Sequence, residues 1–497
     1  MSYSIATPAP FASALDSLRE ELARLLVSHT HEIAGLAAAF LPQLPTPTST
    51  HQFENDLAER LRALGRAVVE WTYNHVEPDD PQAMPPHVVW QGNAYRRKPK
   101  SPNRSLNCLF GPFRLWRHRY EAVDTSEPAI FPLEIALGIE AERATPALAE
   151  RVGHAAAAHT QGGVRELLAR HHGVHWSVKV LRKVTASLSQ GMAEHREAAQ
   201  AAQLVEALRQ ASESAGPHRP TVCVGRDGVM VPLRGSQSFA EAAAGTVSVL
   251  DRRGRRVSTV YLGRMPEKEQ KTLSRQMTSL LLLVMTSWTG VLPRWQYLTD
   301  GGSQPTAYFR QVLRGLRHPL TQVRSSWEWV IDFFHASGYL TKLGEALYGT
   351  TRQGVAWSAK MRRWLRHKDS GIQRVLYSAA AIRARKELSP AAAREYGKAW
   401  RYLQKRKRRM DYADYKRRGL AVGSGVTEAA CKTVFTQRVK QSGMRWGREG
   451  GQVIVDLRIL VLSRVWQQTH QAYLASKPQL TIGTIGSTHV KTAAKAA

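Results

Sequence analysis

Apolar residues near the start of the chain recur with the period of a helix. Leu15, Leu18 and Leu22 lie three or four positions apart with charged residues between them, which predicts a helix over residues 12–41. The same spacing returns over residues 51–75, after a linker rich in proline and threonine. The chain therefore begins with two amphipathic helices, which are candidates for contact with a second copy of the protein.

The pattern changes to alternation between Tyr95 and Tyr120, where apolar and basic residues take turns as on a strand with one charged face. Arg114, Arg117 and Arg119 would project from this hairpin. We expect them either to bind phosphate groups or to form an ordinary solvated strand face.

Helical spacing then resumes and contains a helix-turn-helix pattern. One helix is predicted to end at Gly173, and another begins near Ser177. The second helix carries Lys179, Arg182 and Lys183. These three residues are candidates for DNA binding; the alternative is that the two helices are simply packed neighbours in a helical domain.

From residue 217 the pattern becomes one of short apolar runs rich in β-branched residues. Three runs are followed by a helix predicted to begin at Pro266, a fourth run, a second helix, a fifth run and a third helix. That order is typical of an RNase H-like domain, in which an antiparallel hairpin set is extended by βαβ crossovers into a mixed sheet. The predicted fold class is multidomain α/β, with mainly helical, DNA-binding regions before this catalytic domain.

Two aspartates come directly after predicted strands of this sheet. Asp227 follows the first strand and Asp300 the fourth, and each precedes a glycine. Because residues at the carboxyl ends of neighbouring strands converge on one crevice, the two carboxylates are expected to face each other. Two Mg²⁺ or Mn²⁺ ions, which prefer oxygen ligands, would relieve their repulsion. The alternative is that each Asp-Gly pair is only a turn.

A third carboxylate, Glu428, lies one turn into a helix predicted after Gly423-Ser-Gly. It would complete the metal site, or it would pair with Lys432 at the i,i+4 spacing of a helix. Residues 345–420 before it are helical and strongly basic, which predicts an α-helical insertion suited to a phosphate backbone. Further residues able to hold DNA near the site follow Glu428, and for the tryptophan among them core packing is the alternative: Lys432, Arg438, Lys440, Arg445 and Trp446.

The overall charge indicates a polyanionic partner. Lys and Arg number 70 against 40 Asp and Glu, a formal net charge of +30, which favours nucleic acid; a ribosome-associated or simply basic protein is the alternative. None of the three cysteines belongs to a Cys-x-x-Cys pair, so a zinc ribbon is not supported, and a reducing cytosol is expected. A signal-peptide pattern is missing and no apolar run could span a bilayer, so we expect a soluble, intracellular protein without a membrane partner.

Several motifs together resemble the DDE-type transposases of bacterial insertion sequences, in particular the group named after the element Kra (number four). The resemblance covers about residues 130–466. Its motifs are Asp227-Gly-Val-Met-Val, Thr299-Asp300-Gly-Gly, Asp332-Phe-Phe-His335-Ala-x-x-Tyr-Leu340, Gly423-Ser-Gly-Val-x-Glu428-Ala-Ala-Cys-Lys432 and Arg438-Val-Lys-Gln-Ser-Gly-Met-Arg-Trp446.

The resemblance implies that Asp227, Asp300 and Glu428 are a catalytic triad that binds two metal ions. It also implies that Asp332 and His335 are auxiliary residues near the scissile phosphate; the alternative is that they only buttress the end of the sheet. Such transposases often carry a cysteine pair before a Pro-Leu-x-x-x-Leu-Gly segment. Residues 122–138 lack those cysteines, so a structural zinc site is not expected there.

The implied activity is Mg²⁺-dependent cleavage at the ends of an insertion sequence, followed by attack of the freed 3′-hydroxyl on target DNA. The expected partners are double-stranded DNA, as terminal inverted repeats and target, and a second copy of the chain in a homodimer or higher oligomer. The expected location is the bacterial cytoplasm, at the nucleoid when bound to DNA. The alternatives are a domesticated, catalytically inert DNA-binding regulator and a structure-selective RNase H-like nuclease without strand transfer.

The predicted organisation has seven parts in chain order. They are an N-terminal helical region (1–78), a basic β-rich segment (79–140), a helix-turn-helix-like region (141–216), the first part of the catalytic domain (217–344), a basic helical insertion (345–420), the final helices of the catalytic domain (421–470) and a disordered tail (471–497).

Overall fold

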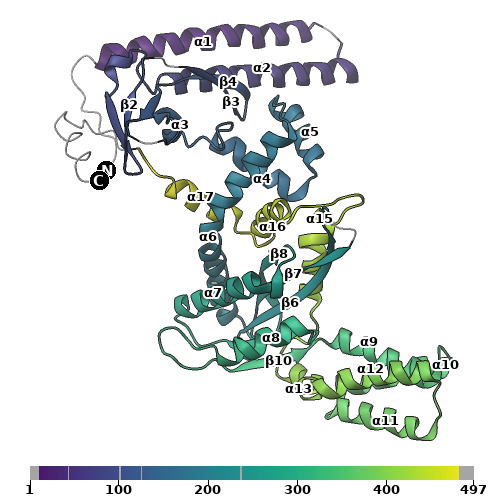
Figure 1. Cartoon of the computed structure of the whole chain (residues 1–497). Helices are drawn as coiled ribbons and strands as arrows, with labels where there is room; N and C mark the ends of the chain where they lie inside the picture. Colours follow the sequence, from purple (N-terminus) through teal and green to yellow (C-terminus); the bar gives the residue numbers. More distant parts are fainter. Residues whose placement is uncertain (1–10, 43, 100–101, 125, 236–237, 481–497) are drawn as a thin grey trace. The chain divides into compact units, whose positions relative to one another are not determined.

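The computed structural model describes residues 11–42, 44–99, 102–124, 126–235 and 238–480. The chain divides into two compact units. One comprises residues 1–188 together with 474–497, and the other residues 189–473. Their boundary falls inside the long helix α6 (Val178–Glu213), so the predicted change to strands at residue 217 lies within the second unit (Figure 1).

The first unit begins with a helical hairpin of α1 (Phe11–Phe40) and α2 (Pro47–Asn74), which confirms both predicted helices. Thr46 caps α2 by accepting a hydrogen bond from the Ser49 amide. The rings of Phe40 and Phe53 stack across the hairpin with centroids 4.7 Å apart. Neither helix has a buried residue among those whose exposure is described.

Five short strands follow: β1 (His87–Trp90), β2 (Asn93–Arg97), β3 (Asn103–Cys108), β4 (Gly111–Trp116) and β5 (Tyr120–Ala122). They form the sheet β1-β2-β5 and the hairpin β3-β4. The predicted alternation is present in β4, where Phe113 and Leu115 are buried while Arg114 and Trp116 are exposed.

Arg117 corrects the prediction of a phosphate-binding hairpin. Its side chain is buried, its Nε lies 2.5 Å from Glu134 Oε1, and its guanidinium sits 3.8 Å from the centre of the Phe131 ring. Because this cation is paired inside the protein, it is not available to DNA. Arg114 and Arg119 remain exposed, and Arg119 pairs with Glu121 at 2.8 Å.

The helices after this region are α3 (Pro132–Ala136), α4 (Pro146–Ala158) and α5 (Gln161–His172). Gly173 ends α5 with a left-handed φ of 60°, which favours glycine, and α6 begins at Val178. The predicted helix-turn-helix elements are therefore confirmed, and the second of them is the start of a 36-residue helix.

The second unit contains a mixed five-stranded sheet in the order β10-β9-β6-β7-β8. β6, β7 and β8 are antiparallel, whereas β6, β9 and β10 are parallel. The order of strands and helices agrees with the prediction. The elements are β6 (Thr221–Pro232), β7 (Phe239–Leu250), β8 (Arg256–Arg264), α7 (Lys271–Ser287), β9 (Arg294–Thr299), α8 (Ser303–Gln311), β10 (Trp327–Ile331) and α9 (Phe333–Tyr348).

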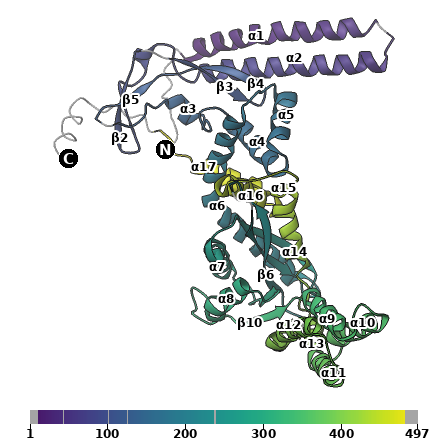
Figure 2. The ribbon, with the colours of Figure 1, turned by 45° about the vertical axis from the view of Figure 1, so that its right-hand side comes forward.

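Both faces of the antiparallel part of the sheet are covered. A side chain at Gly245 would contact Leu273 and Met277 of α7, whereas one at Gly263 would contact Val434 and Val455. These last two lie in the C-terminal helices, which are α14 (Gly425–Ala430), the π-helical turn η5 (Cys431–Thr436), α15 (Gln437–Val439), α16 (Arg448–Leu462) and α17 (Trp466–Ser476). Figure 2 shows α7 and α14 on opposite sides of β6.

A group of helices follows α9 and precedes α14: α10 (Arg352–His367), α11 (Gly371–Arg385), α12 (Pro390–Arg406) and α13 (Tyr412–Arg417). Their helical character was predicted. The group packs against the end of β10, where the Tyr412 hydroxyl donates to the Ile331 carbonyl at 2.9 Å and the Arg409 guanidinium lies 3.9 Å from the centre of the Trp329 ring.

Three predicted boundaries are wrong. Asp227 lies inside β6 and not past its end, because pairing with β7 continues through all twelve residues of the strand. The helix expected from Pro266 begins only at Lys271, after a 3₁₀ turn in which Glu269 and Gln270 have positive φ. Residues 471–476 belong to α17 and not to a disordered tail, since the Trp466 and Thr469 side chains of that helix are buried. The tail from 481 onward lies outside the described residues.

No helix within the described ranges is both long and apolar enough to cross a lipid bilayer.

Candidate active site

Asp227 sits at the point where the parallel part of the sheet ends. β6 pairs with β9 only as far as Gly225, opposite Leu298, so the next residues of β6 have no neighbour on that side of the strand. Asp300 directly follows β9. The two aspartates therefore lie just beyond the same edge of the β6–β9 pair, as the strand order predicted.

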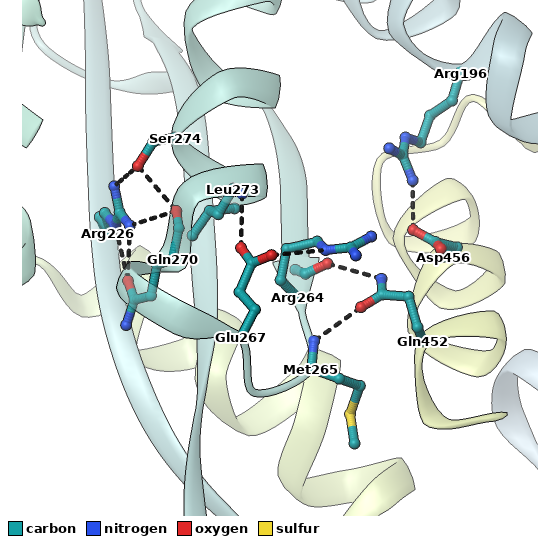
Figure 3. A network of polar contacts seen from close by, with 11 residues as sticks. Arg196, Arg226, Arg264, Met265, Glu267, Gln270, Leu273, Ser274, Gln452 and Asp456 are labelled. Carbon is teal, nitrogen blue, oxygen red and sulfur yellow. Dashed lines mark hydrogen bonds and ion pairs between the residues drawn. The ribbon is translucent and has the colours of Figure 1, made fainter. Parts of the chain in front are cut away.

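Arg226 and Asp227 point to opposite faces of the sheet, because consecutive strand residues alternate. Arg226 is fully buried and donates to Gln270 Oε1, in the turn before α7, at 2.8 Å and to Ser274 Oγ of α7 at 2.8 Å (Figure 3). Asp227 faces the C-terminal helices, where the Cys431 thiol donates to its Oδ2 at 3.6 Å. The buried arginine thus links β6 to the α7 side of the sheet, while the Asp227 carboxylate is half-buried on the opposite face.

The surroundings of Arg226 belong to a wider polar network within the second unit. Figure 3 shows Glu267 accepting from the Leu273 amide at 3.0 Å, and Gln452 of α16 accepting from the Met265 amide at 2.8 Å. Arg196 of α6 pairs with Asp456 of α16 at 2.5 Å. The sheet, α6, α7 and α16 are thus joined by directed bonds as well as by apolar packing.

Glu428 is brought to the same face by the docking of α14 on β6. Thr427 is buried, and its hydroxyl lies 2.9 Å from the Thr246 hydroxyl of β7. A Cβ at Gly225 would collide with the Thr427 side chain, so α14 approaches the strand backbone only because residue 225 is glycine. The carboxylate of the next residue, Glu428, is exposed.

The predicted pairing of Glu428 with Lys432 is not formed; in the described part of the chain no ion pair joins them. The helix widens to π geometry from Cys431, which removes the alignment of residues four positions apart. Pairing with Lys432, the alternative to a metal-binding role for Glu428, is therefore not supported.

The loop that carries Asp300 is held by its own backbone and by the helical group. Asp300 Oδ1 accepts from the Gly302 amide at 2.8 Å. The Tyr402 hydroxyl of α12 donates to the Asp300 carbonyl at 2.6 Å, and Arg406 Nε donates to the Gly301 carbonyl at 3.2 Å. Gly301 has a φ of 73°, and a Cβ there would lie 2.5 Å from Arg406 Nε. The position of Asp300 therefore depends on a helix about a hundred residues later in the chain.

Asp332 is a structural link between the end of β10 and the loop before α14. It is almost fully buried, and its Oδ1 accepts from the His335 amide at 2.6 Å as the N-cap of α9. Its Oδ2 accepts from the Ser424 amide. Both oxygens are occupied by backbone donors, which favours the buttressing interpretation over a direct role at a scissile phosphate.

His335 is exposed and lies beside the aromatic residues of the helical group. Its ring centroid is 5.7 Å from that of Tyr402 and 5.6 Å from that of Tyr339, and the two tyrosines stack at 3.7 Å. It is therefore next to the residue that holds the Asp300 carbonyl.

The electrostatics of Asp227 reflect the nearby carboxylates. Burial raises its pKa above the ordinary value, and the negative charges of Asp300 and Glu428 raise the pKa further. Hydrogen bonds from the Gly228 amide and the Cys431 thiol oppose this rise. Of the residues that the structure describes, however, no three His, Cys, Asp or Glu side chains approach closely enough to hold one metal ion.

The predicted DNA-binding residues divide into two sets. Lys179, Arg182 and Lys183 are exposed on α6, with Arg182 donating to Gln161 at 3.1 Å and Lys183 3.7 Å from Glu142. Lys432 and Arg445 are exposed, and Lys440 is half-buried with its ammonium 5.5 Å from the centre of the Phe239 ring.

Arg438 corrects the prediction for its set. It is fully buried, with its guanidinium 5.2 Å from the centre of the Trp446 ring, and burial lowers its pKa to about 10. Trp446 is half-buried, and its carbonyl accepts from the Arg234 amide at 2.9 Å. Because Arg438 is interior, it is not presented to DNA, whereas Trp446 joins the end of the β6–β7 hairpin through its backbone and its DNA-binding role stays a prediction.

Sequence reasoning missed the residues that support the carboxylates: Gly225, Arg226, Tyr402, Arg406 and Cys431. The three-residue spacing of Glu428 and Cys431 on one helix was a usable signal for Cys431. Nothing local marks Tyr402 or Arg406, because their partners are distant in the chain.

Comparison with models of known protein families gave no match, and comparison with curated protein sequences gave none either.

Proposed function

We propose that this protein is a DNA transposase that cleaves DNA in a metal-dependent reaction and then joins a freed 3′-hydroxyl to target DNA. One observation carries the proposal. Asp227 and Asp300 lie beyond the same edge of the parallel β6–β9 pair, and the docking of α14 on Gly225 adds Glu428 on the face to which Asp227 points. The five-stranded mixed sheet, in which β6 pairs antiparallel with β7 and parallel with β9, is compatible with an RNase H-like fold.

The donor chemistry fits a divalent metal. All three groups are carboxylates, which Mg²⁺ and Mn²⁺ prefer, and the charges of Asp300 and Glu428 both act on Asp227. Asp227, Asp300 and Glu428 would be the ligands. Two bound ions would supply charge stabilisation at phosphorus and activation of the attacking oxygen.

The chain's own residues would orient these ligands. The Gly228 amide directs one oxygen of Asp227 and the Gly302 amide one oxygen of Asp300, each at 2.8 Å. Glu428 is exposed, so its side chain can turn toward the aspartates without displacing the core. Lys432 and Arg445, which are exposed on segments following Glu428, would contact the phosphate backbone.

The test is cleavage of a labelled duplex that carries the terminal repeats flanking the gene, with and without Mg²⁺. Asp227→Asn, Asp300→Asn and Glu428→Gln should each reduce cleavage by at least a thousandfold, while DNA affinity in EDTA changes less than threefold. Asp332→Asn is not a suitable control because the Asp332 carboxylate is buried and accepts from two backbone amides. Glu387→Gln, which changes an exposed carboxylate between α11 and α12, is suitable. Full cleavage by any one of the three variants would exclude that residue from the site.

An inert DNA-binding regulator is the second candidate. The observation that favours it is the absence, among described residues, of three ligand groups within reach of one ion. The same assay decides between them, because a regulator binds the repeats with steep salt dependence and shows no nicking at any Mg²⁺ or Mn²⁺ concentration.

We further propose that α1 and α2 mediate self-association. Their residues with described exposure include none that is buried, although Leu26, Val27 and Leu61 are large and apolar. A second hairpin would bury such a surface. Light scattering should give a dimer or larger species, and deletion of residues 1–46 should give a monomer; a full-length monomer at micromolar concentration would contradict this.

A further inference from the structure

A basic groove lies between α9 and α10, and one of its lining residues, Phe334, contacts the loop that leads into α14. It encloses about 530 Å³ and is lined by Phe334 of α9 and by Arg362, Arg363, Arg366 and His367 of α10. No acidic side chain is among its described lining residues. A cavity of this size accommodates a ligand as large as a nucleotide.

Among the residues that the structure describes, no carboxylate pairs with the arginines of the groove. Arg362 donates to the Thr341 hydroxyl at 3.2 Å, which is a neutral acceptor. Arg366 lies 5.3 Å from the centre of the Phe333 ring, and no described residue forms a hydrogen bond with its buried Nε. Guanidinium groups placed together without carboxylates repel one another, and an anion with several oxygens would relieve this repulsion.

Phe334 is the second feature of the groove. Its side chain is 62% exposed, so the ring is accessible to a ligand in the groove. The edge of its ring faces Gly423, where an added Cβ would lie 2.8 Å from the ring. Gly423 precedes Ser424, whose amide is bound by Asp332, and the loop leads into α14 and Glu428. The exposed ring is therefore held next to the loop that carries the third carboxylate.

We propose that this groove binds one nucleotide of a DNA strand whose base is turned out of its stack. Phe334 takes the face of the base, and Arg362, Arg363 and Arg366 contact the adjoining phosphates. In a regular duplex both faces of every base are covered by neighbouring bases, so an exposed ring can stack only on a base that has been displaced. The inference rests on the proposed function in that DNA is the substrate, and it adds distortion of the strand near the cleavage site.

The experiment measures DNA binding by the full-length protein in EDTA, so that cleavage plays no part. Two labelled DNAs of equal length are compared: a regular duplex, and the same duplex with one unpaired 2-aminopurine in a central bulge. The wild type should prefer the bulged DNA, and 2-aminopurine fluorescence should fall on binding as the base stacks on Phe334. Phe334→Ala should lower affinity for the bulged DNA about tenfold and leave duplex affinity within twofold.

Phe334→Leu is the second variant, in case Phe334→Ala is unstable. Leucine keeps an apolar contact with Gly423 but cannot stack on a base as phenylalanine does, so this variant should also lose the preference for bulged DNA. Tyr377→Ala is the matched control, since Tyr377 of α11 is 79% exposed and lies outside this groove. The proposal is overturned if the Phe334 variants lose affinity equally for both DNAs, or if neither variant loses affinity for the bulged DNA. Displacement of the bulged DNA by micromolar deoxyadenosine monophosphate also overturns it, because the ligand is then a free nucleotide. Failure of Mg²⁺-dependent cleavage with an intact preference for bulged DNA would instead refute only the proposed catalysis.

Discussion

The side chain of Thr427 occupies the space that any side chain at Gly225 would need. A Cβ at Gly225 would collide with Thr427 Oγ1 and would lie 2.7 Å from Thr246 Oγ1. The two threonine hydroxyls are themselves 2.9 Å apart. This close approach of α14 to β6 determines where Glu428 lies, since Glu428 is the next residue of the helix.

Gly225→Ala should therefore displace α14 and reduce cleavage more than it reduces stability. We expect a loss of about 1–3 kcal/mol in the free energy of unfolding, which is typical of overpacking, and a fall in cleavage of at least a hundredfold. The double variant Gly225→Ala/Thr427→Ala removes the colliding hydroxyl and should recover part of the lost stability and part of the lost cleavage activity.

The matched control is Gly397→Ala in α12, where an added Cβ would meet nothing within 4 Å. It should not lower stability, because alanine is the better helix former. A Gly225→Ala variant with wild-type cleavage and melting temperature would show that the close contact does not position Glu428.

Tyr402 should position Asp300 through the backbone. Tyr402→Phe removes the hydroxyl that donates to the Asp300 carbonyl at 2.6 Å, while the stacked Tyr339 ring keeps its partner. We expect a loss of about 1 kcal/mol in stability and a roughly tenfold fall in the rate of cleavage at saturating DNA, about 1.4 kcal/mol.

The apparent Mg²⁺ requirement of Tyr402→Phe should also rise, which purely structural weakening would not produce. Tyr396→Phe in the same helix is the control; Tyr396 is half-buried, and its ring stacks on Trp400. If Tyr396→Phe and Tyr402→Phe behave alike, the bond to Asp300 has no specific role.

Asp332 should act through structure and not through direct contact with DNA. The Asp332 carboxylate accepts hydrogen bonds from two backbone amides. In Asp332→Asn, an NH₂ group replaces one of the two oxygens and cannot accept a hydrogen bond from the amide that it faces. An unsatisfied buried donor costs about 1–3 kcal/mol, so the melting temperature should fall together with cleavage. Unchanged stability with abolished cleavage would instead support the auxiliary catalytic role.

The ionised Asp227 side chain should lower the free energy of unfolding at neutral pH in the absence of metal. Its pKa in the folded protein is raised above the ordinary 3.8 by burial and by Asp300 and Glu428. Folding therefore disfavours the ionised form. This cost is absent below the ordinary pKa, where Asp227 is protonated in both states, and is fully present once pH exceeds the folded pKa.

Asp227→Asn removes the charge and should raise the melting temperature at pH 7 in EDTA. The gain should shrink as pH falls toward 4. Thermal unfolding of both proteins from pH 4 to 8 checks this, with Glu387→Gln as an exposed control that should show no such trend. A variant that is less stable than the wild type at pH 7 would contradict the sign of this effect.

Local pattern was enough to locate most of the elements. The helices α1 and α2 and the succession of strands and helices from β6 to α9 follow from periodicity, because a helix or strand buries one face and repeats its apolar residues accordingly. The ends of elements were less well predicted. Asp227-Gly228 has the composition of a turn, yet both residues continue in β6 because β7 pairs with them.

The sequence by itself determined which residues could form the candidate site: three carboxylates, two of them next to predicted strands, in a chain of strongly positive charge. Tertiary structure decided how they are held. Asp300 is positioned by Tyr402 and Arg406, and Glu428 by Thr427 against Gly225. It also decided that Arg117 and Arg438 are interior residues. The physical reason is that burial and contact depend on segments far apart in the chain, which a local pattern of residues does not encode.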